Sequence, residues 1–252
     1  MPPVNFSLKV LTVNIHKGFS VFNRRFILHE LREAVRDVGA DVVFLQEVHG
    51  SHAHHAERML NWPSAPHYEF LADAIWPTYA YGRNAVYPHG DHGNALLSKF
   101  PIARHRNHDV SLDGTERRGM LHCVLGVPGS LPELHTICVH LGLQRSHRSA
   151  QLETLCRMVL SEVPADAPLI VAGDFNDWQR SAHDVLEECA GMNEVFVAAN
   201  GRAAKTFPSR WPMLSLDRIY VRNATAHSPV LLPRRPWSHL SDHVPLAAEI
   251  SL

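Results

Sequence analysis

The chain has 252 residues, of which 45% are hydrophobic, and this composition suits one large globular domain with a full core. Its formal net charge is −1, so no overall positive field exists that would hold a long nucleic acid by charge alone. No apolar run reaches the ~18 residues that cross a bilayer, and residues 1–5 lack the features of a signal peptide. These features favour a monomeric protein of the cytoplasm.

The predicted elements are short apolar strands interspersed with amphipathic helices. In chain order we predict a strand at 8–13, a helix at 23–38, a strand at 41–45, a His-rich helix with loops at 50–66, strands at 93–98, 102–110, 119–127 and 134–140, a helix at 145–163, a strand at 169–172, a helix at 182–190, and strands at 217–221 and 244–252. Hairpin-like strands mixed with flanking helices predict sheets covered by helices. Without a linker or a repeat, residues 1–252 are expected to form a single domain.

The core positions and the cysteines of this pattern can also be predicted. The helix at 145–163 is expected to turn five side chains inward, those of Ala150, Leu152, Leu155, Met158 and Val159. The cysteines show no paired or metal-binding spacing, so buried free thiols are expected at all four positions: Cys123, Cys138, Cys156 and Cys189.

Carboxylates, amides and imidazoles gather where the apolar strands begin or end. They are Asn14, Gln46-Glu47, His140, Gly173-Asp174-Phe175-Asn176, Asp217 and Ser241-Asp242-His243. Such a set suits a hard cation, because Mg²⁺ binds carboxylates, waters and substrate phosphate. Glu47 is the best ligand candidate, supported by Asp242 and the side-chain carbonyl of Asn14.

The remaining residues of this set suit acid–base chemistry on a phosphoryl group. His243 can exchange protons with a reacting water if a carboxylate such as Asp217 orients its ring. Asp174 can orient or deprotonate that water. Asn176 and His140 can donate hydrogen bonds to the charged phosphoryl group.

These motifs, in this order, resemble those of the endonuclease/exonuclease/phosphatase superfamily, which includes DNase I-like nucleases and neutral sphingomyelinases. The segment from Gly93 to Ile102 is similar to a strand pair of that family, and the resemblance runs from about Leu8 to the C-terminus. It is closest to small stand-alone bacterial members. The resemblance implies a four-layer α/β sandwich, with two packed mixed β-sheets flanked by helices, and Mg²⁺-dependent phosphoester cleavage in which Mn²⁺ can substitute.

The resemblance also implies roles for individual residues. Asn14, Glu47 and Asp242 would be the metal ligands, and Asp217 with His243 would form the carboxylate–imidazole pair. Asp174, Asn176 and His140 would complete the catalytic set. Apart from the resemblance, Asn94 and Arg118 are the residues expected to bind substrate. Which group is the general base and which the acid stays open.

Several features have competing interpretations. Arg118, with Arg117, could bind substrate phosphate or form a solvated turn, and neither is favoured. The histidines at 49, 52, 54 and 55 fit no standard zinc spacing, so a solvated His-rich helix is preferred. Leu214 stands where abasic-site endonucleases carry a tryptophan, which argues against that activity. Trp211 and Trp237 could contact a lipid or belong to the core.

The leading prediction is therefore an Mg²⁺-dependent hydrolase, either a phosphodiesterase or a phosphatase. Its substrate would be a small phosphoester or one that carries a lipid headgroup. A DNA or RNA nuclease of the same fold is the alternative, disfavoured by the neutral charge. A non-catalytic binding member is a remote third reading, because the polar set is intact.

Overall fold

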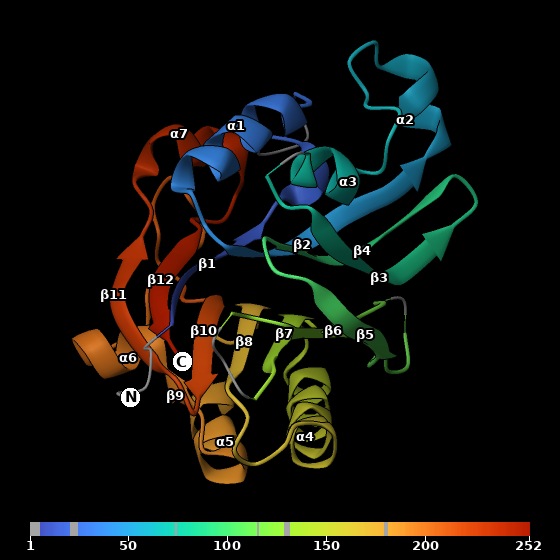
Figure 1. Cartoon of the computed structure of the whole chain (residues 1–252). Coiled ribbons are helices and arrows are strands. Elements are labelled where there is room, and N and C mark those ends of the chain that lie inside the picture. The colour runs from blue at the N-terminus through green and yellow to red at the C-terminus, as the bar shows by residue number, and fades with distance from the viewer. Residues whose placement is uncertain (1–5, 21–24, 74, 115, 129–131, 179–180) are drawn as a thin grey trace.

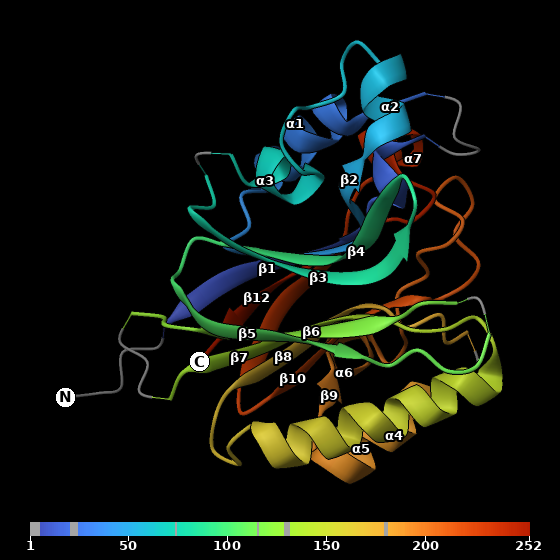
Figure 2. The same ribbon diagram turned by 90° about the vertical axis from the view of Figure 1, so that its right-hand side faces the viewer.

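Two mixed β-sheets pack face to face with helices on their outer sides, as Figures 1 and 2 show from two directions. The computed structural model describes residues 6–20, 25–73, 75–114, 116–128, 132–178 and 181–252. The expected start of the first helix at Asn23 and the N-terminal residues 1–5 lie outside these ranges. The predicted fold, a four-layer α/β sandwich, is confirmed.

The first sheet has the strand order β11-β12-β1-β2-β4-β3 and the second β5-β6-β7-β8-β10-β9. The strands of the first sheet are β1 (Ser7–Asn14), β2 (Val42–His52), β3 (Thr78–Tyr87), β4 (Gly90–Ser98), β11 (Thr225–Leu231) and β12 (Leu246–Ser251). Those of the second are β5 (Ile102–Asp109), β6 (Gly119–Leu125), β7 (Leu134–His140), β8 (Leu169–Asp174), β9 (Asn193–Glu194) and β10 (Asp217–Arg222).

Most helices of the described residues lie outside the two sheets (Figure 2), whereas the short helix Val195–Asn200 packs against a strand of each sheet. They are α1 (Leu28–Val38), α2 (Ala53–Arg58), α3 (His67–Ala72), α4 (Arg145–Glu162), α5 (Ser181–Ala190), α6 (Val195–Asn200) and α7 (Arg234–Leu240), with a short 3₁₀ turn η1 (His16–Gly18). Helices α1, α3 and α7 cover the first sheet, and α4 and α5 cover the second (Figure 1). No helix in the described ranges is both long enough and apolar enough to span a membrane.

Three apolar layers hold these elements together. Between the sheets, Phe44 of β2 packs with Leu121 of β6 and Ile219 of β10. Leu31 of α1 belongs to the layer above the first sheet, and Leu155 of α4 to the layer below the second. Of the five positions predicted to face inward on α4, four are buried, whereas Ala150 is only partly buried.

Each sheet contains one parallel strand pair joined by a helix, and this arrangement positions the polar residues. Strands β1 and β2 run parallel with α1 between them along the chain, and β7 and β8 run parallel with α4 between them. The remaining pairs are antiparallel. The carboxyl ends of parallel neighbours meet at one edge of a sheet, which is where α/β folds bind ligands.

Several sequence predictions are wrong in detail. The strand predicted to end at Leu45 continues to His52, with a bulge at Glu47 where the register with β4 shifts. The cysteines are not all free, because Cys156 of α4 and Cys189 of α5 form a disulfide, while Cys123 and Cys138 are buried thiols. The fold brings these two cysteines together, and their spacing in the sequence did not indicate that they would pair.

The His-rich stretch also differs from the predicted solvated helix. His49 belongs to β2 and is only 3% exposed, whereas His52, His54 and His55 lie at or in the short helix α2. The sequence left open whether Trp211 and Trp237 are core residues. The side chain of Trp237 in α7 is buried in the core, whereas Trp211 is 70% exposed.

Candidate functional site

The strand ends bring the predicted polar residues to one edge of the two sheets. Asn14, the last residue of β1, is aligned with Gln46 of β2. In the second sheet His140, the last residue of β7, is aligned with Asp174 of β8. Strand β10 runs antiparallel to β8 and begins with Asp217 opposite Asp174. Backbone register alone therefore assembles residues that lie far apart in the sequence.

Asp174 is the centre of this group and is 2% exposed. Its Oδ2 accepts a hydrogen bond from Nδ2 of Asn14 at 3.2 Å, which links the two sheets. The same oxygen lies 3.6 Å from Nε2 of His140 and 3.8 Å from Nε2 of His243. Its Oδ1 accepts the backbone N–H of Asn176 at 2.9 Å. One carboxylate thus faces two imidazoles and one amide.

Asp217 and His243 form a buried carboxylate–imidazole pair, with 2.8 Å between Oδ2 and Nδ1. The bond fixes the ring so that Nε2 turns towards Asp174. Burial lowers the pKa of His243, but the negative charges of Asp217 and Asp174 outweigh it and raise that pKa above its usual value. Burial likewise raises the pKa of Asp174. The imidazolium of His243 is therefore stabilised, and the carboxyl of Asp174 binds a proton more readily than an exposed one.

The backbone around this pair is held by hydroxyl groups. Thr206 Oγ1 accepts the backbone N–H of Asp217 at 3.2 Å, and Ser241 Oγ accepts that of His243 at 3.0 Å. The hydroxyl of Ser241 also donates to the backbone oxygen of Asn14 at 2.6 Å. The segment before β12 is thereby tied to the end of β1, although 227 positions separate the two residues.

Glu47 projects from the bulge of β2 with a left-handed backbone, φ 55°. Its Oε1 accepts a 3.5 Å hydrogen bond from Asn14, and Oε2 lies 3.7 Å from Nζ of Lys17. Burial raises the pKa of Glu47, but the interactions with His140, Lys17 and His16 more than offset it and lower that pKa to about 2. With its side chain 21% exposed, Glu47 presents an ionised carboxylate at the edge of the site.

The oxygen donors expected to hold a metal fit a hard cation in their chemistry. The side-chain carbonyl of Asn14 accepts the backbone N–H of His16 and keeps a second lone pair. Asp242 is partly buried, and its Oδ1 lies 3.5 Å from the hydroxyl of Ser241. Amide and carboxylate oxygens are the ligand types that Mg²⁺ prefers.

A different group of three residues brings its potential metal-binding atoms close together at this edge. Among the described residues, Asp174, Asp217 and His243 offer atoms that lie within 4.8 Å of one another. None of the three expected metal ligands belongs to it. The 2.8 Å hydrogen bond between Asp217 and His243 already uses two of its atoms, so we interpret it as a proton-holding network. Groups that can bind a divalent metal are thus present, whichever ion they take.

The two predicted substrate contacts lie deeper than expected. Asn94 is fully buried, and its Nδ2 donates to the backbone oxygens of Gly119 and Cys138. Arg118 donates to the oxygen of Leu141 and pairs with Glu116 at 2.9 Å. Arg118 is therefore not the solvated turn residue that the sequence left open. Contact of either residue with substrate stays a prediction.

Asn176 is held in place by the turn that follows β8. Its backbone is left-handed, with φ 50°, and its Nδ2 donates to the oxygen of Leu141 at 2.9 Å. The buried ring of Phe175 packs below the sheet and fixes the turn between Asp174 and Asn176. In the Gly-Asp-Phe-Asn segment, the buried side chain of Phe175 thus anchors the turn that positions the polar side chains of Asp174 and Asn176.

A cavity of about 410 Å³ lies beside Glu47 and was not foreseen from the sequence. Its lining residues are Lys17, Phe19, His49, His52, His55, Met59, Tyr87 and His92. Burial lowers the pKa of His49 to about 3 and that of His92 to about 4, so both rings are uncharged at neutral pH. The strand-end pattern cannot find these residues, because only the fold brings α2, β3 and β4 against the turn that carries Lys17.

The comparisons with known proteins agree with this geometry. Residues 11–243 match the model of the Endonuclease/Exonuclease/phosphatase family. The Escherichia coli (strain K12) protein called "Uncharacterized protein YbhP" is 58% identical over 247 residues, which cover 98% of this chain and 97% of that protein.

Solved structures share the fold at low sequence identity. The endonuclease/exonuclease/phosphatase from Beutenbergia cavernae is 18% identical with a TM-score of 0.75, over 98% of this chain and 72% of that one. The D. rerio TDP2 complex with a single-strand DNA product is 17% identical with a TM-score of 0.69, over 97% of this chain and 98% of that one. The Bacteroides thetaiotaomicron mannosyl-6-phosphatase is 16% identical with a TM-score of 0.72, over 96% of this chain and 99% of that one. Given the family match across nearly its whole length, the chain belongs to the Endonuclease/Exonuclease/phosphatase family of hydrolases.

Proposed function

We propose that residues 1–252 form a single catalytic domain that hydrolyses a phosphoester with the help of Mg²⁺. The observation that carries the proposal is the position of Asp174 between the imidazoles of His140 and His243, with the ionised carboxylate of Glu47 beside them. Phosphoryl transfer requires groups that position a water, hold protons and stabilise negative charge, and this edge of the sheets supplies all three.

The proposed metal ligands are Glu47, Asn14 and Asp242, and a bound Mg²⁺ would polarise a phosphoryl oxygen of the substrate. Asp174 orients the attacking water and accepts its proton, a task that suits a carboxyl group whose pKa is raised by burial. His243, kept protonated by Asp217, donates from Nε2 to the phosphoryl group. His140 and Asn176 donate further hydrogen bonds to the charge that develops there.

The first test compares a diester with a monoester, bis-p-nitrophenyl phosphate and p-nitrophenyl phosphate, with Mg²⁺. We expect diester cleavage that disappears in EDTA and returns with Mg²⁺ or Mn²⁺. The variant E47Q keeps the size of the side chain and removes its charge, so it should fold and lose turnover by orders of magnitude. Cleavage of the monoester alone would make the protein a phosphatase, and full activity after chelation would contradict the metal role.

An apolar loop beside the site favours a lipid-linked substrate over a purely small one. The ring of Phe207 packs on that of His243, with 5.0 Å between their centroids. Phe207 and Leu214 pair their backbones and close a loop that carries Trp211, 70% exposed, and Met213, 65% exposed. Exposed apolar side chains at the rim of a polar site suit a lipid tail or membrane surface.

This preference has its own test, which does not depend on the chemistry of the site. Replacing Trp211 and Met213 by Ala should reduce cleavage of a phospholipid diester in vesicles and leave bis-p-nitrophenyl phosphate turnover unchanged. Leu160 is 66% exposed on α4, so Leu160→Ala is the matched control and should affect neither. Equal losses on both substrates would show that the loop acts on the site itself.

A nuclease stays the alternative. The structure of D. rerio TDP2 holds a single-strand DNA product, and the protein from B. thetaiotaomicron is a mannosyl-6-phosphatase, so the shared fold serves diesters and monoesters. Here Lys17 and Arg118, two of the cations near the site, each face a carboxylate, which weakens the positive strip that a nuclease would need. Cleavage of plasmid or single-stranded DNA by the wild type and not by E47Q would reverse the preference.

The cytoplasmic location and the monomeric state remain predictions from the sequence. The disulfide between Cys156 and Cys189 opposes the first, because reducing compartments keep thiols free. Cell fractionation decides the location, and the sedimentation of the purified protein decides the oligomeric state.

A further inference from the structure

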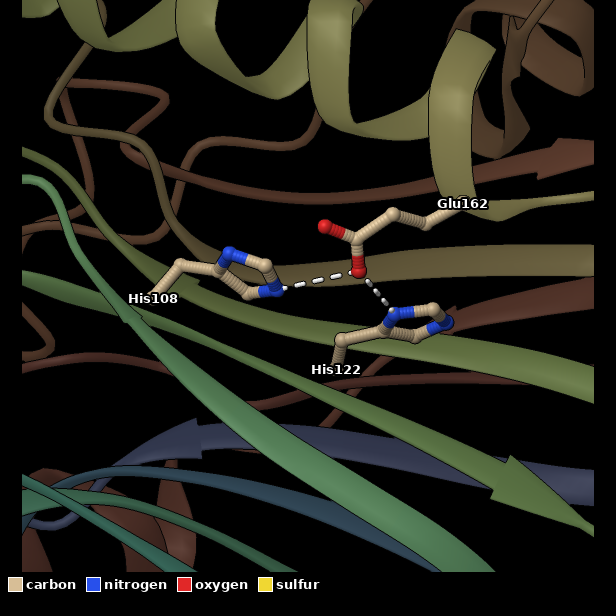
Figure 3. Close-up of side chains that lie close together, drawn as sticks. All are labelled: His108, His122 and Glu162. Carbon is tan, nitrogen blue, oxygen red and sulfur yellow. Dashed lines mark hydrogen bonds and ion pairs between the residues drawn. The ribbon is translucent and has the colours of Figure 1, made fainter.

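Three potential metal ligands meet below the second sheet, outside the site described above. They are His108 of β5, His122 of β6 and Glu162, the last residue of α4 (Figure 3). One oxygen of Glu162, Oε2, lies 3.2 Å from Nε2 of His108 and 3.4 Å from Nδ1 of His122. Figure 3 shows both rings turned towards this oxygen from neighbouring strands.

We propose that His108, His122 and Glu162 bind one zinc ion, with water completing a four-coordinate site. Zinc takes imidazole nitrogens at ~2.0–2.1 Å and carboxylate oxygens at ~2.0–2.2 Å. Ligands at such distances in a tetrahedron are ~3.3–3.5 Å apart. The two distances to Oε2, 3.2 and 3.4 Å, are close to that value, and all three ligand atoms lie within 4.8 Å of one another.

The contact between His108 and Glu162 is not a good hydrogen bond, although the two atoms are close. Nε2 of His108 is buried and lacks a hydrogen-bond partner of acceptable geometry, even though Oε2 is 3.2 Å away. A buried polar atom without a partner is costly. Coordination of an ion by the lone pair of this nitrogen removes that cost, because it does not require the N–H···O alignment.

A further histidine is placed to orient the ring of His122 for metal binding. Nε2 of His122 lies 2.9 Å from Nδ1 of His135 on β7. When Nε2 carries the proton and donates it to His135, the lone pair of Nδ1 faces Glu162. Metal-binding histidines are commonly oriented through the other ring nitrogen in this way.

The donor set selects a different ion from the one proposed at the catalytic edge. Two imidazoles and one carboxylate suit zinc, whereas the carboxylate and amide oxygens around Glu47 suit Mg²⁺. Arg106 approaches the other oxygen of Glu162, Oε1, at 3.9 Å with a side chain 73% exposed, so it leaves Oε2 free for the ion.

The two sites lie on different strands of the second sheet, because His108 and His122 belong to β5 and β6, whereas His140 and Asp174 end β7 and β8. Helix α4 begins at Arg145, just after His140, and Glu162 is its last residue. An α-helix of this length spans ~25 Å. The proposed ligand His122 is aligned with Ile137 in the middle of β7, whereas His140 is the last residue of that strand. The ion would join the edge strand β5 to β6 and α4, which stabilises an edge rather than taking part in hydrolysis.

Cobalt is the probe for this site, because Co²⁺ replaces zinc and absorbs visible light much more strongly in tetrahedral than in octahedral coordination. The untagged, EDTA-treated protein is titrated with Co²⁺ in excess Mg²⁺, which fills the oxygen-rich edge. We expect one tetrahedral cobalt per chain. E162Q and H108A should weaken its binding by more than ~100-fold, beyond the loss typical of indirect partners, and H135A by ~10–100-fold.

Matched controls separate coordination from general damage. His105 is exposed on the same strand as His108, and Glu153 is exposed on the same helix as Glu162, so H105A and E153Q should bind cobalt like the wild type. E47Q should also keep the tetrahedral spectrum. Bis-p-nitrophenyl phosphate turnover should be the same in E162Q and the wild type. An octahedral spectrum, or equal cobalt affinity in the wild type and E162Q, would overturn the proposal.

Discussion

At the scale of single residues, the hydrogen bond from His243 to Asp217 sets the proton state of the candidate site. The charges of Asp217 and Asp174 raise the pKa of His243, although burial opposes them. A group with a raised pKa is protonated up to a higher pH than usual. If the imidazolium donates to substrate, activity persists below this pKa and is lost as the pH rises through it.

Asp217→Asn tests this directly, since the amide oxygen can still accept from Nδ1 while the charge is gone. The pKa of His243 should fall, so the alkaline limb of the kcat profile should move ~1–3 pH units lower. The pH dependence of bis-p-nitrophenyl phosphate hydrolysis measures it, with Asp166→Asn on the exposed surface as control. A variant with less activity but an unmoved limb would mean that Asp217 is structural only.

The sequence predicted most of the residues at this edge, and the reason is physical. Asn14, His140 and Asp174 each end an apolar strand, and strands that run parallel must end together. Lys17 and Thr206 carry no such signal, because one lies in a turn after a strand and the other in a loop before one. Their contacts exist only in three dimensions.

At the scale of elements, the bulge in β2 determines the direction of Glu47. The register with β4 shifts between Leu45 and Val48, and Glu47 takes a left-handed φ of 55°. Such a backbone costs ~1–2 kcal/mol for a residue with a Cβ atom and almost nothing for glycine. The strand therefore gives up stability to aim one carboxylate at the site.

A pair of variants isolates this cost. Glu47→Gly and Glu47→Ala both remove the carboxylate and its contacts with Asn14 and Lys17, so both should be inactive. The glycine variant should be more stable than the alanine variant by ~1 kcal/mol in urea unfolding, because only it tolerates this φ freely. If the alanine variant were equally stable, the bulge would relax when the carboxylate is absent.

Glu194 makes stability depend on pH at the junction of β9 and α6. Its Oε2 accepts the backbone N–H of Val197 at 2.6 Å, which caps the helix. Burial raises the pKa of this carboxyl from 4.5 to about 7. The folded protein therefore binds the proton more tightly than the unfolded chain, and this stabilisation is complete below about 4.5 and lost as the pH rises through about 7.

Glu194→Gln removes the titration and keeps an oxygen that can cap the helix. In the wild type, this group should lower the free energy of unfolding by up to ~3 kcal/mol between acidic and neutral pH. The variant should show a correspondingly smaller decline when urea unfolding is measured at several pH values. A parallel decline in both proteins would assign the effect to other groups, such as Asp174.

Two of the strands that the sequence missed, β3 and β11, have few buried positions. They form the two edges of the first sheet, and most of their residues are exposed or half-buried. Strand β3 contains Gly82, Arg83 and Asn84, which are typical of a turn, and β11 contains Pro229. An edge strand forms because it pairs with a neighbouring strand, so the residues of the strand itself show little of the apolar pattern by which strands are predicted.

At the scale of the whole molecule, the two helices that cover the outer side of the second sheet are joined by a covalent bond. Cys156 of α4 and Cys189 of α5 are joined across 33 positions, with their Cα atoms 6.0 Å apart. A bond that closes such a loop restricts the unfolded chain and stabilises the folded one by ~2–4 kcal/mol. The other two thiols are fully buried, and burial raises the pKa of Cys138 to about 12, which makes it unreactive.

Reduction should therefore destabilise the protein in a specific way. We expect dithiothreitol to lower the free energy of unfolding by ~2–4 kcal/mol, measured by urea denaturation before and after treatment. The double variant C156A/C189A should already have the lower stability and should not respond to reductant. Alkylation of the oxidised protein under denaturing conditions should modify only Cys123 and Cys138.

The result also bears on where the protein works. If thiols trapped in living cells show Cys156 and Cys189 oxidised, the predicted cytoplasmic location is wrong, since that compartment reduces such bonds. If all four thiols are trapped as free, the location stands, and helices α4 and α5 must be held by packing alone. In that case the free energy of unfolding that remains after treatment with reductant is the stability of the protein in the cell.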